Sequence, residues 1–150
     1  MRHLAIFLFA LTVPIALVAG HSKDPWVGTW KLNAAKSQYG GGPGLQSETI
    51  VIGADGKVTV TAVNSGGQPV IWSYTYSDGR EVPISGMENS TVIEKRTRKT
   101  MEQTWKMPTA SSTGKGVLSK DGKVLTYTLD GTDTEGHHQH DVLVFEKQAT

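Results

Sequence analysis

Trp72, Tyr74 and Tyr76 recur at every second residue, and Trp105 and Tyr127 lie in other stretches where apolar residues alternate, a spacing that places such side chains on one face of a β-strand. Rings gathered on one face could enclose a small, largely apolar molecule, and tyrosine hydroxyls with an amide would orient it by hydrogen bonds. The alternative is that the rings simply fill the core, because a small barrel needs bulky side chains in its interior. The predicted ligand-binding residues are Trp72, Tyr74, Tyr76, Met101, Gln103, Trp105 and Tyr127.

Three histidines, His137, His138 and His140, lie close together near the C-terminal end of the sequence. Imidazole is the commonest metal ligand in proteins, so capture of zinc or copper is one interpretation, with Asp133 or Asp141 nearby. The other interpretation is a polar loop tip. Because no His-x-x-x-His helix motif accompanies these residues, we assign no metal-binding residues and expect no cofactor.

A basic run at residues 95–99 (KRTRK) could contact a phosphate or an anionic lipid, but we interpret it as a solvated hairpin tip flanked by Glu94 and Glu102. The sequence contains no Gly-x-Ser-x-Gly elbow and no phosphate-binding loop. It also contains no cysteine, which excludes a thiolate nucleophile, a disulfide and a cysteine-ligated zinc site. We therefore predict no catalytic residues.

The elements that must position these side chains are β-strands, because segments rich in Val, Ile, Thr, Tyr and Trp alternate with turn residues. Hairpin dipeptides such as Asp55-Gly56, Asp78-Gly79 and Asp121-Gly122 predict type I′ turns with positive φ at both central residues. Turns spaced about 11–12 residues apart favour consecutive antiparallel hairpins. The predicted strands are residues 26–32, 47–52, 57–64, 69–77, 80–83, 91–96, 100–107, 113–119, 123–130 and 141–147.

These strands predict an all-β fold, a closed up-and-down antiparallel β-barrel of about 8–10 strands, because closure removes the sticky edges of a sheet. An open β-sandwich is the alternative. The connection from Asn33 to Gln46 is rich in glycine and is expected to hold no regular element. It is either a floppy crossing or a lid over a portal. Alternation also predicts an inward row formed by Val58, Val60 and Ala62.

Residues 1–20 are predicted to be a signal peptide, and residues 21–150 a single barrel domain. A short basic start precedes the apolar run from Leu4 to Val18, and small residues lead up to Gly20. The run is shorter than the roughly 20 residues of a spanning helix, so we expect cleavage, a secreted or periplasmic location and no stable membrane insertion afterwards. Loss of Arg2 leaves 14 basic and 14 acidic residues. A neutral domain has no electrostatic attraction to nucleic acid, so no nucleic-acid partner is expected.

The two ends of this domain resemble the calycins, which comprise the lipocalins and the fatty-acid-binding proteins. Residues 26–32 (WVGTWKL) are similar to the first calycin strand, where Gly28 and Trp30 match its Gly-x-Trp signature. Residues 142–147 (VLVFEK) resemble the last strand of fatty-acid-binding proteins. In lipocalins a cation near this end lies over the capping tryptophan, and the resemblance implies that role for Lys147. The chain as a whole resembles small exported bacterial lipocalin-like proteins.

The resemblance implies an exported, lipocalin-like barrel whose partner is a small apolar molecule bound inside. The last strand lacks the Arg-x-Tyr pair with which fatty-acid-binding proteins hold a carboxylate, and the glycine-rich connection replaces their helix pair, so fatty-acid binding in that manner is not expected. One alternative is a filled barrel that acts as an interaction or scaffold module. Another is a calycin-type enzyme or a metal-binding protein that uses the three histidines.

Overall fold

The structure is a computed structural model that describes residues 24–132 and 136–149, so the predicted signal peptide and Asp133 lie outside the described residues. The described residues hold eleven strands and one short 3-10 helix, η1 (Ala34–Lys36), and no helix among them is long and apolar enough to cross a membrane. The strands are β1 (Gly28–Leu32), β2 (Gln38–Tyr39), β3 (Ser47–Ile52), β4 (Lys57–Val63), β5 (Pro69–Thr75), β6 (Glu81–Pro83), β7 (Thr91–Arg96), β8 (Thr100–Lys106), β9 (Ser111–Leu118), β10 (Val124–Thr132) and β11 (His138–Lys147).

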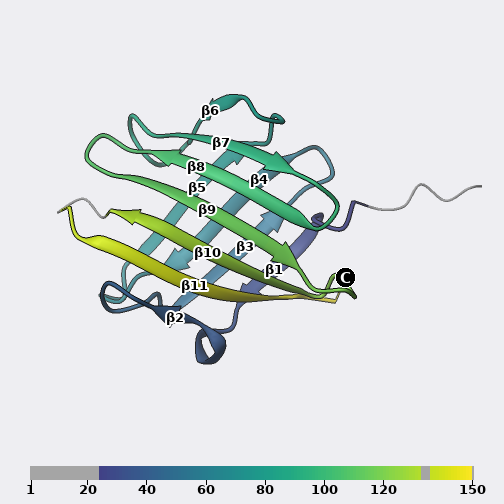
Figure 1. The fold of residues 1–150 in the computed structure, drawn as a ribbon, viewed down its shortest axis with the longest axis horizontal. Helices are drawn as coiled ribbons and strands as arrows, with labels where there is room; N and C mark the ends of the chain where they lie inside the picture. Colours follow the sequence, from purple (N-terminus) through teal and green to yellow (C-terminus); the bar gives the residue numbers. More distant parts are fainter. Residues whose placement is uncertain (1–23, 133–135, 150) are drawn as a thin grey trace, which may run out of the picture.

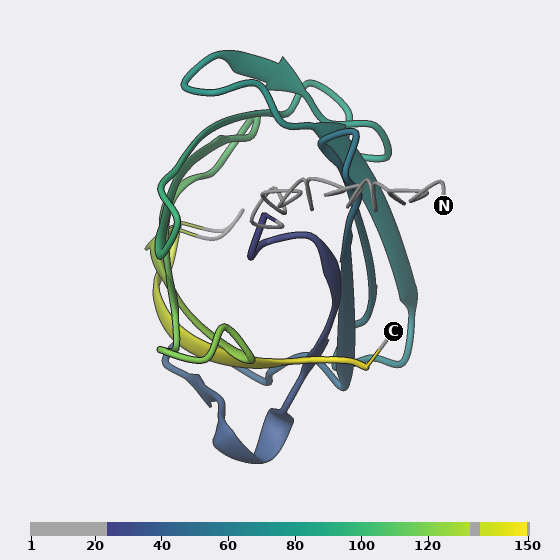
Figure 2. The ribbon, with the colours of Figure 1, turned by 90° about the vertical axis from the view of Figure 1, so that its right-hand side faces the viewer.

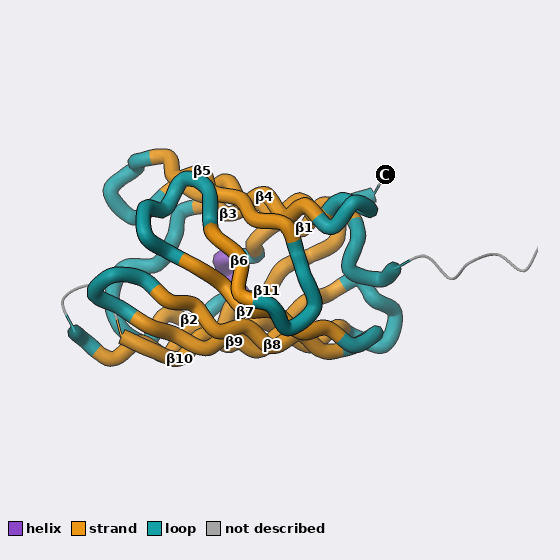
Figure 3. The backbone as a smooth tube through the Cα atoms, turned by 90° about the horizontal axis from the view of Figure 1, so that it is seen from above, coloured by secondary structure: helices purple, strands orange, loops and turns teal. Residues whose placement is uncertain are grey.

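The strands form one curled antiparallel sheet in the order β5-β4-β3-β1-β11-β10-β9-β8-β7-β6, with β2 added beside β11 (Figure 1). β1 pairs with both β3 and β11, which joins the first strand of the barrel to the last. In the view of Figure 2, the sheet curls round into a nearly complete ring. From above, β3, β4 and β5 run along one side and β8, β9 and β10 along the other (Figure 3).

The barrel is nearly closed, and its margin lies between β5 and β6. No ladder joins these two strands; instead Ser73 and Ser85 exchange two backbone hydrogen bonds, of 2.9 and 2.8 Å. The predicted antiparallel barrel is therefore confirmed, and the sheet does not split into the two layers of an open sandwich. Val70 and Ile71 are exposed apolar residues of β5, next to this margin; Val70 lies on the same face as Trp72 and lines the cavity, whereas Ile71 faces outwards.

All ten predicted strands are present, with ends that differ by at most three residues, and β2 is the strand that the sequence did not indicate. The predicted turn type was wrong. In these loops the glycine alone has positive φ, at 84° for Gly56, 67° for Gly79 and 70° for Gly122, while the preceding aspartates do not. This geometry matches the longer hairpin loop in which a turn is followed by a left-handed glycine. The hairpin predicted at Asp78-Gly79 was also wrong, because its loop joins β5 to β6, which are not paired.

One end of the barrel is sealed by tryptophans. Trp26 and Trp30 are fully buried; the Trp26 indole donates to the Thr97 carbonyl at 2.7 Å, and the Trp30 indole donates to the Trp26 carbonyl at 2.9 Å. The Lys147 ammonium lies 4.9 Å from the centre of the Trp30 ring, as the resemblance implied. Gly28 has φ 139°, and a Cβ there would lie 2.8 Å from Lys147 Cε, so the glycine makes room for the lysine stem.

The glycine-rich connection between β1 and β3 is more ordered than expected, since it holds both η1 and β2. Asn33 caps η1 by accepting a hydrogen bond from the Lys36 amide. Tyr39 and Leu45 from this connection line the interior of the barrel. Gly44 permits their approach, because a Cβ at that position would lie 2.1 Å from the Tyr39 ring. The connection therefore covers part of the barrel instead of crossing it loosely.

Candidate functional site

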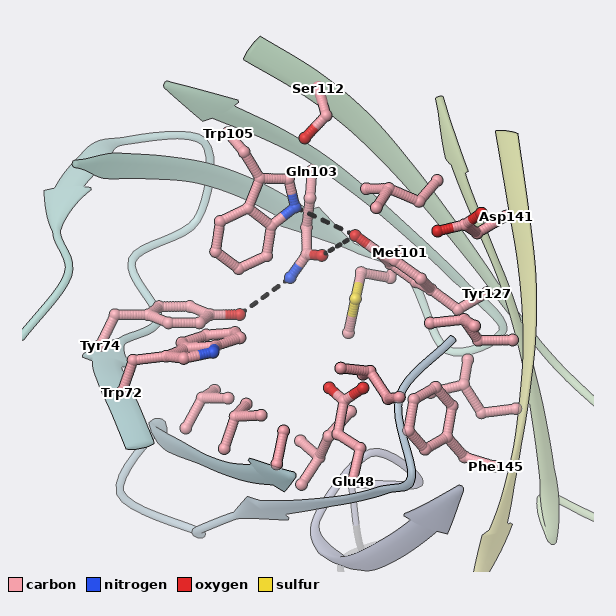
Figure 4. A pocket seen from close by; sticks show the side chains of 18 of the residues that line it. Glu48, Trp72, Tyr74, Met101, Gln103, Trp105, Ser112, Tyr127, Asp141 and Phe145 are labelled. Atoms are coloured by element: carbon pink, nitrogen blue, oxygen red, sulfur yellow. Dashed lines mark hydrogen bonds between the residues drawn. The ribbon is translucent and has the colours of Figure 1, made fainter. Parts of the chain in front are cut away.

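The inward rows of the strands surround a cavity of about 360 Å³ (Figure 4). Most of its wall is apolar, because alternate residues of β4, β8 and β10 turn inward as predicted. Val58, Val60 and Ala62 lie along the wall, as does Met107 just beyond β8. The interior is therefore not completely filled by side chains. The predicted ligand-binding residues that line the cavity are Trp72, Tyr74, Met101, Gln103, Trp105 and Tyr127.

Three aromatic rings form a continuous wall across the margin between β5 and β6. Trp72 and Tyr74 of β5 are stacked, with ring centres 6.1 Å apart and planes inclined by 14°. Trp105 of β8 meets both rings edge to face, at 5.1 Å from Trp72 and 6.0 Å from Tyr74. Stacked and edge-to-face contacts are the preferred geometries of aromatic pairs, so this wall is rigid.

The polar atoms of the cavity wall bond chiefly to one another. The Trp105 indole donates to the Tyr127 hydroxyl at 3.0 Å, and that hydroxyl donates to Gln103 Oε1 at 2.6 Å. Gln103 Nε2 donates to the Tyr74 hydroxyl at 2.9 Å (Figure 4). It also donates to Glu94 Oε2 at 2.6 Å. Burial raises the pKa of both tyrosines, so they remain protonated at neutral pH. Gln103 therefore has protein partners for both of its polar atoms.

A buried ion pair on β7 is joined to this network by hydrogen bonds. Glu94 and Arg96 are adjacent inward residues of β7, with side chains 2% and 6% exposed, and their carboxylate and guanidinium form a salt bridge. The Tyr74 hydroxyl also donates to the Glu94 carboxylate. The interpretation of this region as a solvated tip was thus wrong for these two residues. A strand continues through Arg96, and its alternation turns both side chains inward.

Tyr76 is the predicted site residue that does not line the cavity. β5 ends at Thr75, and the Tyr76 ring packs against the Arg96 guanidinium, 4.3 Å from ring centre to carbon. Its hydroxyl donates to Asp78 at 3.1 Å. Tyr76 therefore supports the buried ion pair instead of the cavity wall.

Glu48 lines the cavity, and the sequence analysis missed it. It shares the inner face of β3 with Ile50 and Ile52, and its carboxyl group points into the cavity (Figure 4). No hydrogen bond or ion pair joins it to another described residue. Burial raises the pKa of Glu48 from 4.5 to about 7. Strand alternation could have predicted that Glu48 faces inward, because it lies two residues before Ile50 and therefore on the same face of the strand.

The charged lining residues give the cavity an acidic character. Asp141 joins Glu48 in the lining, and its Oδ1 accepts a hydrogen bond from the Gly40 amide at 3.0 Å. Among the described residues, Arg96 is the one basic residue of the lining, and its charge is matched by Glu94. A carboxylate ligand would therefore find no unmatched cation in this part of the structure.

The histidines lie outside the cavity. His138 and His140 belong to β11, and His137 directly precedes it. The exposed His140 pairs through Nδ1 with Asp130, and this hydrogen bond raises the pKa of His140. Within residues 24–132 and 136–149, no group of three or more histidine or acidic side chains is arranged to hold a metal ion.

Comparison with known proteins supports the fold but assigns the chain to no family. No protein-family model matches the chain, and no curated protein matches its sequence. Crystal structures of the fluorescent protein UnaG do match. The wild-type structure is 16% identical, with 82% of this chain and 97% of that chain covered at a TM-score of 0.52. A single-residue mutant of UnaG is 15% identical, with 83% and 96% covered at a TM-score of 0.54. The chain therefore shares the barrel fold of UnaG.

Proposed function

We propose that this protein binds a small, largely apolar molecule in the cavity of its barrel. The observation that carries the proposal is the cavity of about 360 Å³ walled by Trp72, Tyr74 and Trp105. Small-molecule sites are mostly apolar hollows of roughly 300–1,000 Å³ with a few placed polar groups. The cavity has both properties, and it lies inside a rigid sheet.

Burial of apolar ligand surface would supply most of the binding free energy, at about 25 cal/mol per Å². The stacked rings of Trp72 and Tyr74 offer a flat surface, and Trp105 closes one side of it. Gln103 and the tyrosine hydroxyls are bonded to one another, so their role is to hold this wall in place before the ligand arrives. A wall that is already ordered loses little conformational entropy on binding.

Titration with N-phenyl-1-naphthylamine, a neutral apolar dye, tests the proposal. We expect dye emission to rise and tryptophan emission to fall in a saturable manner, because Trp72 and Trp105 line the cavity. Ala62→Phe should abolish this signal, since Ala62 is buried in the wall and a larger side chain there fills the cavity. The control is Thr61→Phe, at the neighbouring exposed position of β4. Absence of saturable binding, or equal binding by both variants, would contradict the proposal.

We also propose that the chain is exported to a secreted or periplasmic location, on the basis of the signal-like pattern in residues 1–20. Expression of the full-length chain in a bacterial host with a periplasm tests this. We expect the protein in the periplasmic fraction, with a mass that indicates cleavage after Gly20 or within about two residues of it. Leu11→Arg interrupts the apolar run and should leave an uncleaved cytoplasmic chain. An uncleaved wild-type chain in the cytoplasm would refute export.

A further inference from the structure

Glu48 is a carboxylic acid in a place where the barrel offers it no partner. Its carboxyl group points into the cavity from β3, across from Gln103 (Figure 4). The described residues supply no hydrogen-bond donor to it, and its same-face neighbours are apolar: Ile50 along β3 and Ala62, its partner on β4. Glu48 is half-buried. Carboxylates withdrawn from bulk water are normally paired or hydrogen-bonded, so an unpaired one that faces a cavity points to a partner that arrives from outside.

The charged and titratable groups around Glu48 do not neutralise it. Tyr39 on β2 and Tyr127 on β10 are close enough for its charge to raise the pKa of each, and neither carries positive charge. Asp141 on β11 is a second acid in the lining. Arg96 on β7 bonds through Nε to Glu94, and its buried Nη2 has no hydrogen-bond partner among the described residues, but it forms no ion pair with Glu48. The interior thus has an unmatched negative charge whenever Glu48 is ionised.

We propose that Glu48 selects the ligand, so that this cavity takes an apolar molecule carrying a protonated amine or another N–H donor and disfavours carboxylates such as fatty acids. This inference rests on the proposed function, because it names the ligand class of the same cavity. The apolar body of the ligand lies against Trp72 and Trp105, and its donor group forms a charge-assisted hydrogen bond with the Glu48 carboxylate.

Three probes with the same alkyl chain and different head groups test the proposal: decylamine, decanol and decanoate. Affinities for the purified protein are measured at pH 8 by calorimetry and by quenching of tryptophan emission. We expect decylamine to bind at least about tenfold more tightly than decanol, because a hydrogen bond to a charged group contributes about that factor. Decanoate should bind more weakly than decanol, because its charge repels Glu48.

Glu48→Gln keeps the shape of the side chain and removes its charge. We expect this variant to lose about tenfold in decylamine affinity while its decanol affinity stays within about twofold. The matched control is Glu102→Gln on the exposed face of β8, which should leave all three affinities unchanged. If Glu48→Gln does not fold, the ranking of the three probes on the wild-type protein decides the question.

The outcomes separate this inference from the proposed function. Equal affinities for the three probes, or an amine preference that persists in Glu48→Gln, would overturn the role of Glu48 and leave small-molecule binding intact. Failure of all three probes to bind would overturn both. A loss of decylamine affinity when the pH is lowered from 8 to 6, with decanol affinity constant, would support the role of Glu48, because the carboxyl then holds a proton.

Discussion

The Lys147 ammonium lies over the Trp30 ring, 4.9 Å from its centre, and donates a hydrogen bond to the Pro25 carbonyl at 2.7 Å. This contact ties the last strand to the segment that precedes the first strand. It also covers the sealed end of the barrel, where Trp26 and Trp30 are buried. Partial burial lowers the pKa of Lys147 below its ordinary 10.5.

Lys147→Met should reduce the free energy of unfolding by about 1–2 kcal/mol. The substitution keeps an unbranched apolar stem but removes the cation–π contact and the hydrogen bond to Pro25. Urea unfolding followed by tryptophan emission measures the effect. Lys31→Met, at an exposed position of β1, serves as the control and should change stability by less than about 0.5 kcal/mol. Equal effects of the two substitutions would refute the role of the Lys147 contact.

Glu94→Leu should destabilise the fold by about 3–5 kcal/mol, because it leaves the Arg96 guanidinium buried without its carboxylate. The double variant Glu94→Leu/Arg96→Met should be more stable than the single variant, because it removes both charges together. Urea unfolding of the two single variants and the double variant gives the coupling energy. A double variant as unstable as the sum of its singles would show that the two side chains act independently.

Glu48 should make the protein less stable as the pH rises from about 4.5 to 8. Its pKa in the folded chain is about 7, above the ordinary 4.5, so the folded state binds more protons than the unfolded state in this window and stability falls with rising pH. The difference between the two pKa values corresponds to about 3 kcal/mol of folding stability, at about 1.36 kcal/mol per pKa unit. Because water reaches the carboxyl through the cavity, we expect the loss of stability to be about 2 kcal/mol. Glu48→Gln should remove this part of the pH dependence in urea titrations at pH 5 and 8. An unchanged slope would refute the raised pKa.

Gly114→Ala should disturb the polar network without touching the aromatic wall directly. Gly114 on β9 lies beneath the Tyr127 hydroxyl, and a Cβ there would be 1.8 Å from that oxygen. Tyr127 must then move away from Trp105 and Gln103, at a cost of about 1–3 kcal/mol. Unfolding curves and a shift of tryptophan emission report the change. Gly66→Ala in an open hairpin loop is the control, since the nearest atom lies at 3.4 Å.

Strand alternation predicted most of this fold and much of the cavity wall. The pattern of β8 placed Met101, Gln103 and Trp105 inside because a period of two needs no knowledge of the partner strands. The same rule wrongly placed Tyr76 in the cavity wall, because β5 ends at Thr75 and the Tyr76 hydroxyl bonds to Asp78 in the following turn. Alternation carries information only as long as the strand continues.

Residue type alone could not predict that Glu94 and Glu48 face the interior of the barrel. Glu94 lies inside because Tyr74, Gln103 and Arg96 satisfy its carboxylate, and two of these partners come from other strands. Contacts between residues on different strands cannot be predicted from the spacing of residues within one strand. Glu48 was missed for a different reason: a glutamate in a strand is normally assigned to the solvent face, and here it faces an apolar hollow.

The margin of the barrel is bridged by Ser73 of β5 and Ser85, two residues beyond the end of β6, whose backbones exchange two hydrogen bonds. Along the described sheet from β5 to β6, by contrast, neighbouring strands are held by ladders of three or more residue pairs. The side chains of Trp72 and Tyr74 bridge the same gap, through the ring contacts with Trp105 and the hydrogen bonds of Tyr74 with Glu94 and Gln103. Closure of the barrel at this margin therefore relies on side chains inside it more than on backbone pairing, and the rings that line the cavity also hold the two edges of the sheet together.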